Sequence, residues 1–459
     1  MRFGTDGIRG VANVDLTPEV ATAAGRAAAR TLEGTPFVIG RDTRRSGPML
    51  EAALVAGLTA EGVDAMILGV VPTPTVAFAS RLLGVPGAVI SASHNPFADN
   101  GIKFFAPGGR KLPDALEDAL EAELARLLDG DRVAGRSGSA VGVTRTGSEE
   151  LVDAYAGHVV GALAGRDLAG MEIVVDCSNG SASELGPRIL RELGALVTVV
   201  NADPDGTNIN AGCGSTDPVH VQEAVVRLGA TAGLAFDGDA DRVIAVDETG
   251  ALVDGDQILA VCAIDLAARD ALPGSALAAT VMSNIGLRRA LAARGIGLVE
   301  TPVGDRHVWA AMREHGLALG GEQSGHVIFA EHADTGDGIL TGALLLDAVG
   351  RAGARLSELA GVVTRFPQVL LNVAVADRAG LDAARGFWDQ VRAVSTELGD
   401  DGRVLVRPSG TEPVVRVMVE APTDERAAAC ADRLAVALTR ELGEPEPGRG
   451  PGLTGPRGL

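Results

Sequence analysis

The residues that end an apolar segment near position 90 could carry a phosphoryl group or act as a nucleophile. In the stretch ISASHNP, Ser93 stands directly before His94, after an apolar run that ends at Ile90. Lys103 follows soon after, and it is one of only two lysines in the chain. An Asn-Pro pair is a good turn initiator, so a strand followed by an ordinary turn is the plain interpretation. The alternative is that Ser93 is a nucleophile or phosphate carrier at a strand end.

Three aspartates alternate along the segment DGDADR, residues 237–242. On a tight loop, Asp237, Asp239 and Asp241 can converge on one hard cation, for which oxygen atoms are the natural ligands. A solvated acidic turn is the plain alternative. An EF-hand does not fit, because Arg242 stands where that loop needs glycine. The pattern therefore favours Mg²⁺, one ion per chain, with a phosphate oxygen completing the site.

Two polar loops could bind a phosphorylated sugar. In GGEQSGH (320–326), glycines let the backbone approach a ligand, and Glu322 and Ser324 offer acceptors and a donor for sugar hydroxyls. In RPSGTEPVVR (407–416), two arginines with hydroxyl and backbone N–H groups can bind an oxyanion. Each loop alone could be an ordinary surface turn. The second is not a P-loop, because GxxxxGK[ST] occurs nowhere in the chain.

Two further segments concentrate arginine without indicating a function alone. FGTDGIRG (3–10) presents Arg9 beside glycines, and GRDTRRSG (40–47) contains three arginines. Most arginines in such patterns are solvated.

Short apolar runs that alternate with helical patterns must position these loops. Thr17 and Pro18 predict the cap and first residue of a helix, and Asp114 and Glu117 have capping-box spacing at the start of another. Such alternation predicts parallel sheets covered by helices, with the first three motifs at strand ends in one shared cleft. The fourth block has two β runs and a helix over 424–442. The expected strands are 36–40, 65–71, 87–91, 172–176, 196–200, 231–236, 242–247 and 276–282.

The composition limits the classes of partner. The chain has 459 residues and a formal net charge of −20, from 60 acidic and 40 basic residues. This charge argues against nucleic acid and anionic membranes as partners, although local arginines still permit a phosphorylated small molecule. Four widely spaced cysteines predict neither a disulfide framework nor a zinc site. No signal region and no long apolar segment occur, so we expect a cytoplasmic location.

The four motifs ISASHNP, DGDADR, GGEQSGH and RPSGTEP, in this order, resemble the α-D-phosphohexomutase superfamily, from Phe3 to about Glu420. The resemblance implies an α/β protein with three similar α/β domains, mostly parallel mixed sheets, and a smaller α+β C-terminal domain around a central cleft. The expected parts are a phosphoserine-carrying domain (1–150), a metal-binding domain (151–251), a sugar-binding domain (252–366), a phosphate-binding domain (367–443) and a disordered Pro/Gly tail (444–459).

The resemblance also implies roles for the residues that match these motifs. Ser93 would be phosphorylated, Lys103 and His326 would transfer protons, and Arg9 and Arg242 would add positive charge. The implied metal ligands are Ser93, Asp237, Asp239 and Asp241; the implied catalytic residues are Ser93, Lys103, Arg9, His94, Arg242 and His326; the implied substrate-binding residues are Glu322, Gln323, Ser324, Arg407, Ser409, Gly410, Thr411 and Arg416.

Several details resemble the phosphoglucosamine mutase branch, namely Ser91, Gln323, TPVGDR (301–306) and TGDGI (335–339). This branch implies an isomerase that interconverts glucosamine 6-phosphate and glucosamine 1-phosphate through a phosphoserine and a 1,6-bisphosphate. Its product would feed UDP-N-acetylglucosamine and cell-wall synthesis. Glucose or glucosamine 1,6-bisphosphate as activator, and a homodimer, are compatible with it. His307 departs from the branch, which often has tyrosine there, and we expect this change to be neutral.

Other interpretations remain open at this level. A phosphomannomutase or phosphoglucomutase of the same superfamily would share the motifs. A metal-dependent phosphomonoesterase would share the first half-reaction, but it has no need of a second phosphate-binding loop. A non-catalytic sugar-phosphate sensor would keep the binding loops without turnover.

Overall fold

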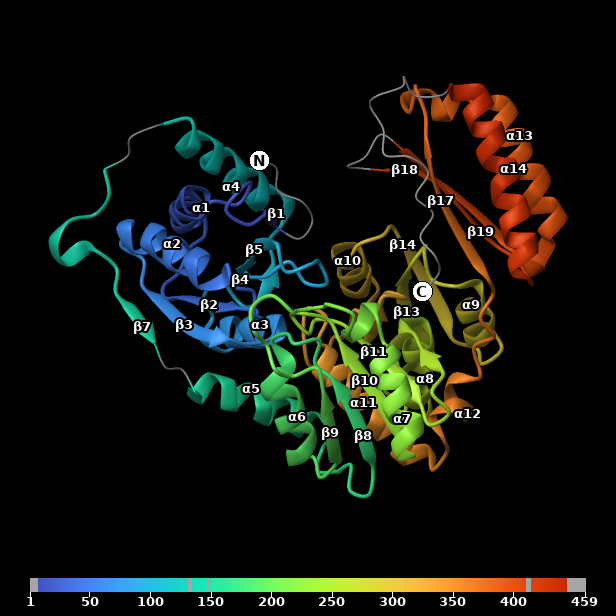
Figure 1. The fold of residues 1–459 in the computed structure, drawn as a ribbon, viewed down its shortest axis with the longest axis horizontal. Helices are drawn as coiled ribbons and strands as arrows, with labels where there is room; N and C mark the ends of the chain where they lie inside the picture. Colours follow the sequence, from blue (N-terminus) through green and yellow to red (C-terminus); the bar gives the residue numbers. More distant parts are fainter. Residues whose placement is uncertain (1–6, 131–133, 147–148, 410–413, 444–459) are drawn as a thin grey trace. The chain divides into compact units, whose positions relative to one another are not determined.

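The computed structural model describes residues 7–130, 134–146, 149–409 and 414–443 (Figure 1). The chain forms two compact units. The first unit consists of residues up to 282 together with 294–362, and the second unit consists of residues 283–293 together with the chain from 363 onward. Each unit is described by itself. Within the described ranges, no helix is both long and apolar enough to cross a membrane.

The first sheet carries the loop that contains Ser93. Its described strands run in the order β1-β5-β4-β2-β3-β7, with β6 beside β5. β2 is parallel to β3 and β4, whereas β5 is antiparallel to β4 and β1, so the sheet is mixed. The elements are β1 (Ile8–Val11), α1 (Pro18–Thr31), β2 (Phe37–Arg41), α2 (Gly47–Ala60), β3 (Ala65–Val70), α3 (Thr73–Leu83), β4 (Gly87–Ile90), β5 (Asp99–Ala106), β6 (Arg110–Lys111), α4 (Asp114–Leu128) and β7 (Thr144–Thr146).

Alternate residues of β2 enter different cores, because successive side chains of a strand point to opposite faces. Phe37 and Ile39 pack with residues of α1, α2 and α4, whereas Val38 packs with Val76 of α3. Helices therefore cover both faces of the first sheet, as the alternating pattern predicts (Figure 1).

Two smaller mixed sheets complete the first unit. One has the order β12-β11-β10-β8-β9 and the other β14-β13-β15-β16. In the first, β10, β8 and β9 are parallel, whereas β11 and β12 pair antiparallel. In the second, β14, β13 and β15 are parallel, whereas β16 pairs antiparallel. The elements are α5 (Glu149–Ala162), β8 (Glu172–Asp176), α6 (Ala182–Glu192), β9 (Leu196–Val200), α7 (Val219–Leu228), β10 (Ala232–Phe236), β11 (Val243–Asp247), β12 (Leu252–Val253), α8 (Gly255–Ala268), β13 (Ala276–Thr280), β14 (Gly297–Thr301), α10 (Asp305–His315), β15 (Leu319–Gly321), β16 (Val327–Phe329), α11 (Gly338–Ala352) and α12 (Leu356–Ala360).

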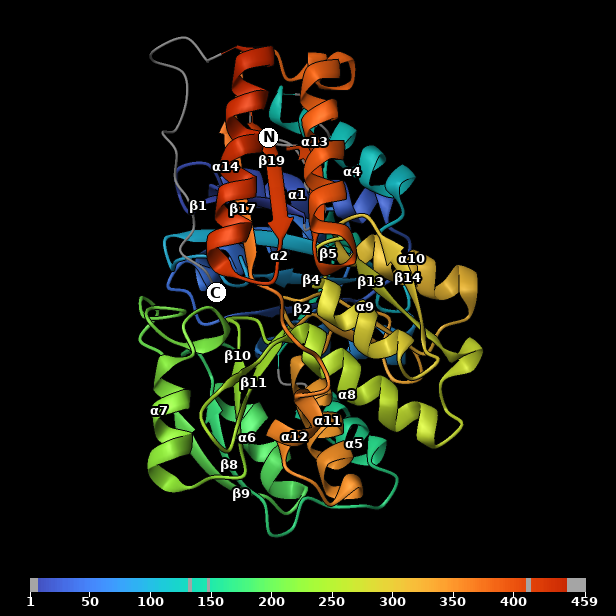
Figure 2. The ribbon, with the colours of Figure 1, turned by 90° about the vertical axis from the view of Figure 1, so that its right-hand side faces the viewer.

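The second unit is an antiparallel sheet covered by two long helices. Its strand order is β17-β19-β18, and Phe387, Leu434 and Leu438 are among the residues of its core. Figure 2 shows α13 and α14 side by side. The elements are α9 (Ile285–Ala292), β17 (Gln368–Ala374), α13 (Arg385–Leu398), β18 (Arg403–Pro408), β19 (Val414–Glu420) and α14 (Asp424–Leu442).

The fold class predicted from the sequence is confirmed: three α/β sheets with helices, and a smaller α+β part near the C-terminus. The cap at Thr17 is also confirmed, since its side chain accepts a hydrogen bond from the Val20 N–H. The capping box at Asp114 is wrong, because the helix is capped by Pro113 and Asp114 makes no side-chain capping bond. Asp114 and Glu117 instead form ion pairs with Arg306. The expected tail, 444–459, lies outside the described residues.

Candidate active site

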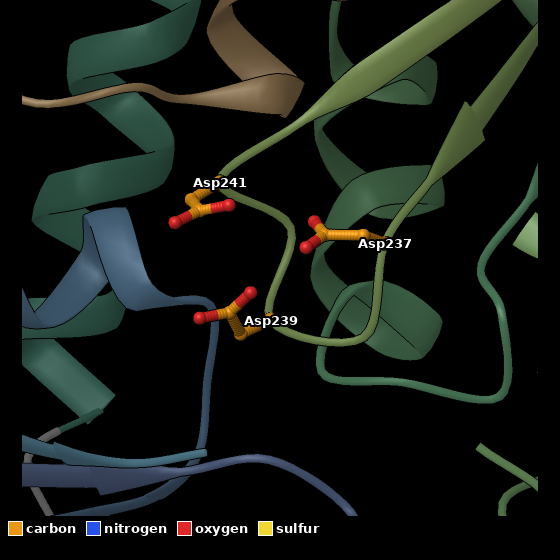
Figure 3. A group of neighbouring side chains, drawn as sticks. All are labelled: Asp237, Asp239 and Asp241. Carbon is orange, nitrogen blue, oxygen red and sulfur yellow. The ribbon is translucent and has the colours of Figure 1, made fainter. Parts of the chain in front are cut away.

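The acidic segment DGDADR forms the turn between β10 and β11. Asp237, Asp239 and Asp241 are buried, and each has a carboxylate oxygen within 4.8 Å of the others. Figure 3 shows the three carboxylates facing one another across the turn. In the described part of the chain, Oδ1 of Asp239 and Oδ1 of Asp241 are buried without a hydrogen-bond partner. Unsatisfied buried carboxylate oxygens are costly, and oxygen ligands suit Mg²⁺, so these residues fit a divalent cation.

Burial and neighbouring charges shift the pKa values of two aspartates of the loop in opposite directions. Burial, together with the neighbouring Asp239 and Asp241, raises the pKa of Asp237 well above its usual range. Burial alone would also raise the pKa of Asp241, but Lys103, His326 and Arg242 hold it well below its usual range. Like charges this close disfavour ionisation of all three groups at once. A divalent cation would relieve that repulsion.

Ser93 lies in the turn between β4 and β5, and its side chain points at the acidic loop. Its Oγ donates a hydrogen bond to Oδ2 of Asp237 at 2.5 Å, and it lies 3.2 Å from Nδ1 of His94. Ser93 is only 2% exposed. The sequence hypothesis required the aspartates to face this hydroxyl, and they do.

Cationic side chains surround the serine and the aspartates. Nζ of Lys103 lies 3.3 Å from Oδ2 of Asp241 and 3.9 Å from Oδ2 of Asp239. Nε of Arg242 lies 3.8 Å from Oδ1 of Asp241. Burial and the positive charges of Arg242 and Arg9 lower the pKa of His94 to about 4, so His94 is neutral near pH 7. The structure thus brings these predicted residues together around Ser93.

His326 is buried between two carboxylates, directly before β16. Its Nδ1 lies 3.7 Å from Oδ2 of Asp241, and its Nε2 lies 3.3 Å from Oδ2 of Asp305. The backbone N–H of Gly336 donates to Nε2 at 3.0 Å. Burial would lower the pKa of His326, but Asp241 and Asp305 raise it above its ordinary value.

Three consecutive backbone carbonyl groups of the acidic loop each accept a hydrogen bond from the start of a different helix. The helices are α6, α3 and α11, and helix N-termini carry a partial positive charge that stabilises nearby anions. The bonds run from Ser181 N–H to Gly238 O at 2.9 Å, from Thr73 N–H to Asp239 O at 2.9 Å, and from Gly338 N–H to Ala240 O at 3.0 Å. The loop is therefore held in place by the chain itself.

The predicted sugar-binding loop connects β15 to β16. Oε1 of Glu322 accepts a hydrogen bond from the Gly304 N–H at 3.1 Å, and Nε2 of Gln323 donates to Oδ2 of Asp254 at 3.4 Å. Asp254 also caps α8, so the loop is tied to a helix start. Within the described chain, the buried Oγ of Ser324 has no hydrogen-bond partner.

The predicted phosphate-binding residues belong to the second unit. Arg407 of β18 lies directly opposite Arg416 of β19. Burial and the charge of Arg416 lower the pKa of Arg407. Like charges opposite each other are destabilising, and a bound anion would offset this repulsion. Ser409 is buried, and its carbonyl oxygen accepts a hydrogen bond from Nη1 of Arg378 at 2.6 Å. Gly410 and Thr411 lie outside the described residues.

Sequence reasoning missed two residues that contact the site. Oγ1 of Thr73 donates to Oδ2 of Asp239 at 2.7 Å, although 166 positions separate them. Asp305 contacts His326 and forms an ion pair with Lys111. Thr73 stands between prolines at the start of a helix, which predicts a helix start but no partner. Asp305 lies within TPVGDR, the segment that resembles the branch, so a signal for it was present.

Comparison with known proteins identifies the class. Family models described as phosphoglucomutase/phosphomannomutase alpha/beta/alpha domains I, II and III and C-terminal domain match residues 1–129, 153–250, 254–366 and 370–437. A phosphoglucomutase/phosphomannomutase family protein of Burkholderia thailandensis has a similar structure, with a TM-score of 0.79 and 29% identity over 99% of both chains. Fold and domains together define a phosphohexomutase.

The curated relatives narrow this class. A phosphoglucosamine mutase of Thermobifida fusca is 52% identical over 96% of this chain and 98% of its own length. One of Streptomyces coelicolor is 51% identical over 96% and 99%. The chain therefore belongs to the phosphoglucosamine mutase family. An N-acetylphosphoglucosamine mutase of Aspergillus fumigatus, in complex with GlcNAc-6P and magnesium, shares the fold at 20% identity, with a TM-score of 0.68 over 96% of both chains.

Proposed function

We propose that this protein interconverts glucosamine 6-phosphate and glucosamine 1-phosphate, with Ser93 as the phosphate carrier. The observation that carries the proposal is the 2.5 Å hydrogen bond from Oγ of Ser93 to Asp237, inside a group of three buried aspartates. Relatives that are 52% and 51% identical over nearly the whole chain are named phosphoglucosamine mutase. We also propose that the product, glucosamine 1-phosphate, feeds UDP-N-acetylglucosamine and cell-wall synthesis.

The proposed Mg²⁺ ligands are Asp237, Asp239, Asp241 and an oxygen on Ser93. When bound, the ion would neutralise the carboxylates and polarise a phosphoryl oxygen. Phosphoryl transfer asks mainly for positioning and charge stabilisation, which the buried loop and its surrounding cations are suited to supply.

The first transfer moves the phosphoryl group from Ser93 to the sugar. The bond between phosphorus and Oγ of Ser93 breaks, a bond from phosphorus to O1 of glucosamine 6-phosphate forms, and Oγ gains a proton as O1 loses one. Lys103 and His326 flank Asp241 and are the candidates to accept the proton of O1, which either can do only in its neutral form. Arg9 and Arg242 add positive charge beside the developing negative charge, and neutral His94 orients the Oγ atom.

The second transfer returns a phosphoryl group to the serine. The 1,6-bisphosphate turns around, its O6–phosphorus bond breaks, and Oγ of Ser93 loses its proton and bonds to that phosphorus, while O6 gains a proton. Arg407, Ser409 and Arg416, with Gly410 and Thr411, would bind the phosphate that is not reacting. The adjacent arginine charges support this assignment, because an anion offsets their repulsion. Glu322, Gln323 and Ser324 would bind the sugar hydroxyls and the 2-amino group.

The test is turnover with glucosamine, glucose and mannose 6-phosphates in the presence of Mg²⁺ and the matching 1,6-bisphosphate. We expect the highest kcat/KM with the amino sugar. Preference for an unaminated sugar would instead indicate a phosphoglucomutase or phosphomannomutase. Steady release of free phosphate without an isomerised product would indicate a phosphomonoesterase.

Ser93→Ala should fold and lose mutase activity, and undiminished turnover would rule out Ser93 as the phosphate carrier. Intact mass should show one labile phosphate, localised to Ser93.

A further inference from the structure

The arginine-rich segment GRDTRRSG contains a buried ion pair that the proposed function does not use. The segment runs from the end of β2 to the start of α2. Asp42 and Arg44 within it are both 0% exposed. A buried ion pair is tolerated only when its remaining hydrogen-bonding groups are satisfied. The partners of Arg44 therefore indicate what the pair does.

All five N–H groups of the Arg44 guanidinium donate hydrogen bonds. Nε donates to Oδ2 of Asp42 at 2.8 Å. The other four N–H groups donate to backbone carbonyl oxygens of the turn that carries Ser93 and of Asp99, the first residue of β5. Nη2 donates to Ser93 at 2.9 Å and to Asn95 at 2.8 Å, and Nη1 donates to Asp99 at 2.9 Å and to Pro96.

A closed series of hydrogen bonds passes through both polar groups of the Ser93 backbone. The Ser93 N–H donates to Oγ of Ser91 at 2.9 Å, and the Ser91 hydroxyl donates to Oδ2 of Asp42 at 2.6 Å. The same carboxylate oxygen accepts from Arg44, and Arg44 donates to the Ser93 carbonyl. Nδ2 of Asn210 donates to that carbonyl as well, at 2.9 Å. Both the N–H group and the carbonyl group of Ser93 are therefore held by hydrogen bonds, which restrict rotation of its backbone.

The conformation of Ser93 needs such support. Its φ is +52°, in the left-handed region, which is uncommon for residues other than glycine. Backbone in this region persists where the surrounding structure enforces it. The direction of a side chain from its Cα follows from the backbone angles, so this conformation sets where Oγ of Ser93 points. It points at Asp237.

We propose that Arg44 is a positioning residue for the phosphate carrier. With Asp42 and Ser91, it holds Ser93 in the left-handed conformation, so that Oγ returns to the same point after each gain and loss of the phosphoryl group. This inference rests on the proposed function of Ser93. Arg44 does not touch the reacting atoms. Lysine cannot replace it, because an ammonium group has three donors and lacks the planar fork that spans these carbonyl groups.

Arg44→Lys tests the proposal, with Arg351→Lys as the matched control. Arg351 is a partly buried arginine that donates to both carboxylate oxygens of Asp265 at 2.8 Å, and its ion-pair partners Asp265 and Asp347 lie on α8 and α11. Both variants lose a guanidinium fork. We expect kcat to fall about 100-fold for Arg44→Lys with KM within about twofold of wild type, because small misplacements of a reacting group cost about this much. Arg351→Lys should keep kcat within about twofold.

A second pair of variants separates positioning from general loss of stability. Ser91→Ala removes one link of the series without uncovering the ion pair, and Ser91→Thr keeps the hydroxyl. We expect the single-turnover transfer from glucosamine 1,6-bisphosphate to Ser93, followed by intact mass, to slow about tenfold for Ser91→Ala and to recover for Ser91→Thr. If Arg44→Lys does not fold, this pair decides alone.

Different results would overturn the proposed mutase function and the positioning role of Arg44. A wild-type protein without mutase turnover would overturn the proposed function. A wild-type mutase in which Arg44→Lys loses no more kcat than Arg351→Lys, or in which Ser91→Ala transfers at the wild-type rate, would overturn only the role of Arg44. A crystal structure of Arg44→Lys should show Ser93 outside the left-handed region, and an unchanged φ would also contradict the proposal.

Discussion

The buried carboxyl group of Asp337 should make the first unit less stable as pH rises from about 4 to about 6. Asp337 caps α11, accepting from the Leu340 N–H at 3.0 Å, and the Tyr155 hydroxyl lies 2.9 and 3.0 Å from its two oxygens. Despite these bonds, burial raises the pKa of Asp337 from 3.8 to about 6. The folded protein therefore binds this proton more tightly than the unfolded chain does.

The size of the effect follows from that pKa difference. Each unit of pKa shift is worth about 1.4 kcal/mol, so ionising Asp337 in the folded state costs about 3 kcal/mol in all. Below about pH 3 both states are protonated and almost nothing is lost. Integrating over the titration, about 2 kcal/mol of that loss falls between about pH 4.5 and about pH 7.

The measurement compares Asp337→Asn with its parent by urea unfolding across this pH range. The chain has two tryptophans, Trp309 in the first unit and Trp388 in the second. With Trp388→Phe as the background, fluorescence reports the first unit alone. The difference between Asp337→Asn and the background cancels the titrating groups that do not interact with Asp337, and a changed cap adds only a constant. We expect the variant to gain about 2 kcal/mol relative to the background as pH rises. A difference that is independent of pH, or of opposite sign, would refute the reasoning.

Other perturbations of the site have defined outcomes. Thr73→Val removes a hydrogen bond to Asp239 and should weaken Mg²⁺ binding about tenfold by calorimetric titration, whereas Thr73→Ser should keep it; equal affinities would contradict this role. Removing Mg²⁺ with a chelator should abolish turnover but leave the circular dichroism spectrum intact, because helix N-termini already hold the loop, and loss of that spectrum would count against preorganisation. Arg416→Met should raise KM for sugar phosphates about tenfold without lowering the unfolding stability of the second unit, since it removes repulsion with Arg407; an unchanged KM would exclude a phosphate-binding role.

The chemistry of the site could be predicted where it is local in sequence. Asp237, Asp239 and Asp241 are separated by single residues, and a turn between strands brings them together without help from distant segments. Their meeting with Ser93 could be expected only from strand-end geometry and the family resemblance. The partner of Asp239, Thr73, could not be predicted, because no local pattern encodes a contact across 166 positions.

The failed capping box shows the same limit. Asp114 and Glu117 have the right spacing, but Pro113 already occupies the cap position, and Arg306 offers both carboxylates a cationic partner. The two carboxylates therefore pair with a distant arginine and do not cap the helix. His307, the next residue, is exposed on α10, and its neutrality stays a prediction.

The three helix starts that bind consecutive carbonyls of the acidic loop have a consequence for recombination. Family models divide the chain into separate segments, which suggests exchangeable modules. Yet α3, α6 and α11 come from three such segments and meet on residues 238–240. A hybrid that takes the segment with the loop and α6 from a distant homologue would have to fit the N–H donors of α3 and α11, which come from two other segments. The C-terminal segment faces the same requirement, because residues 283–293 of the third segment belong to its compact unit.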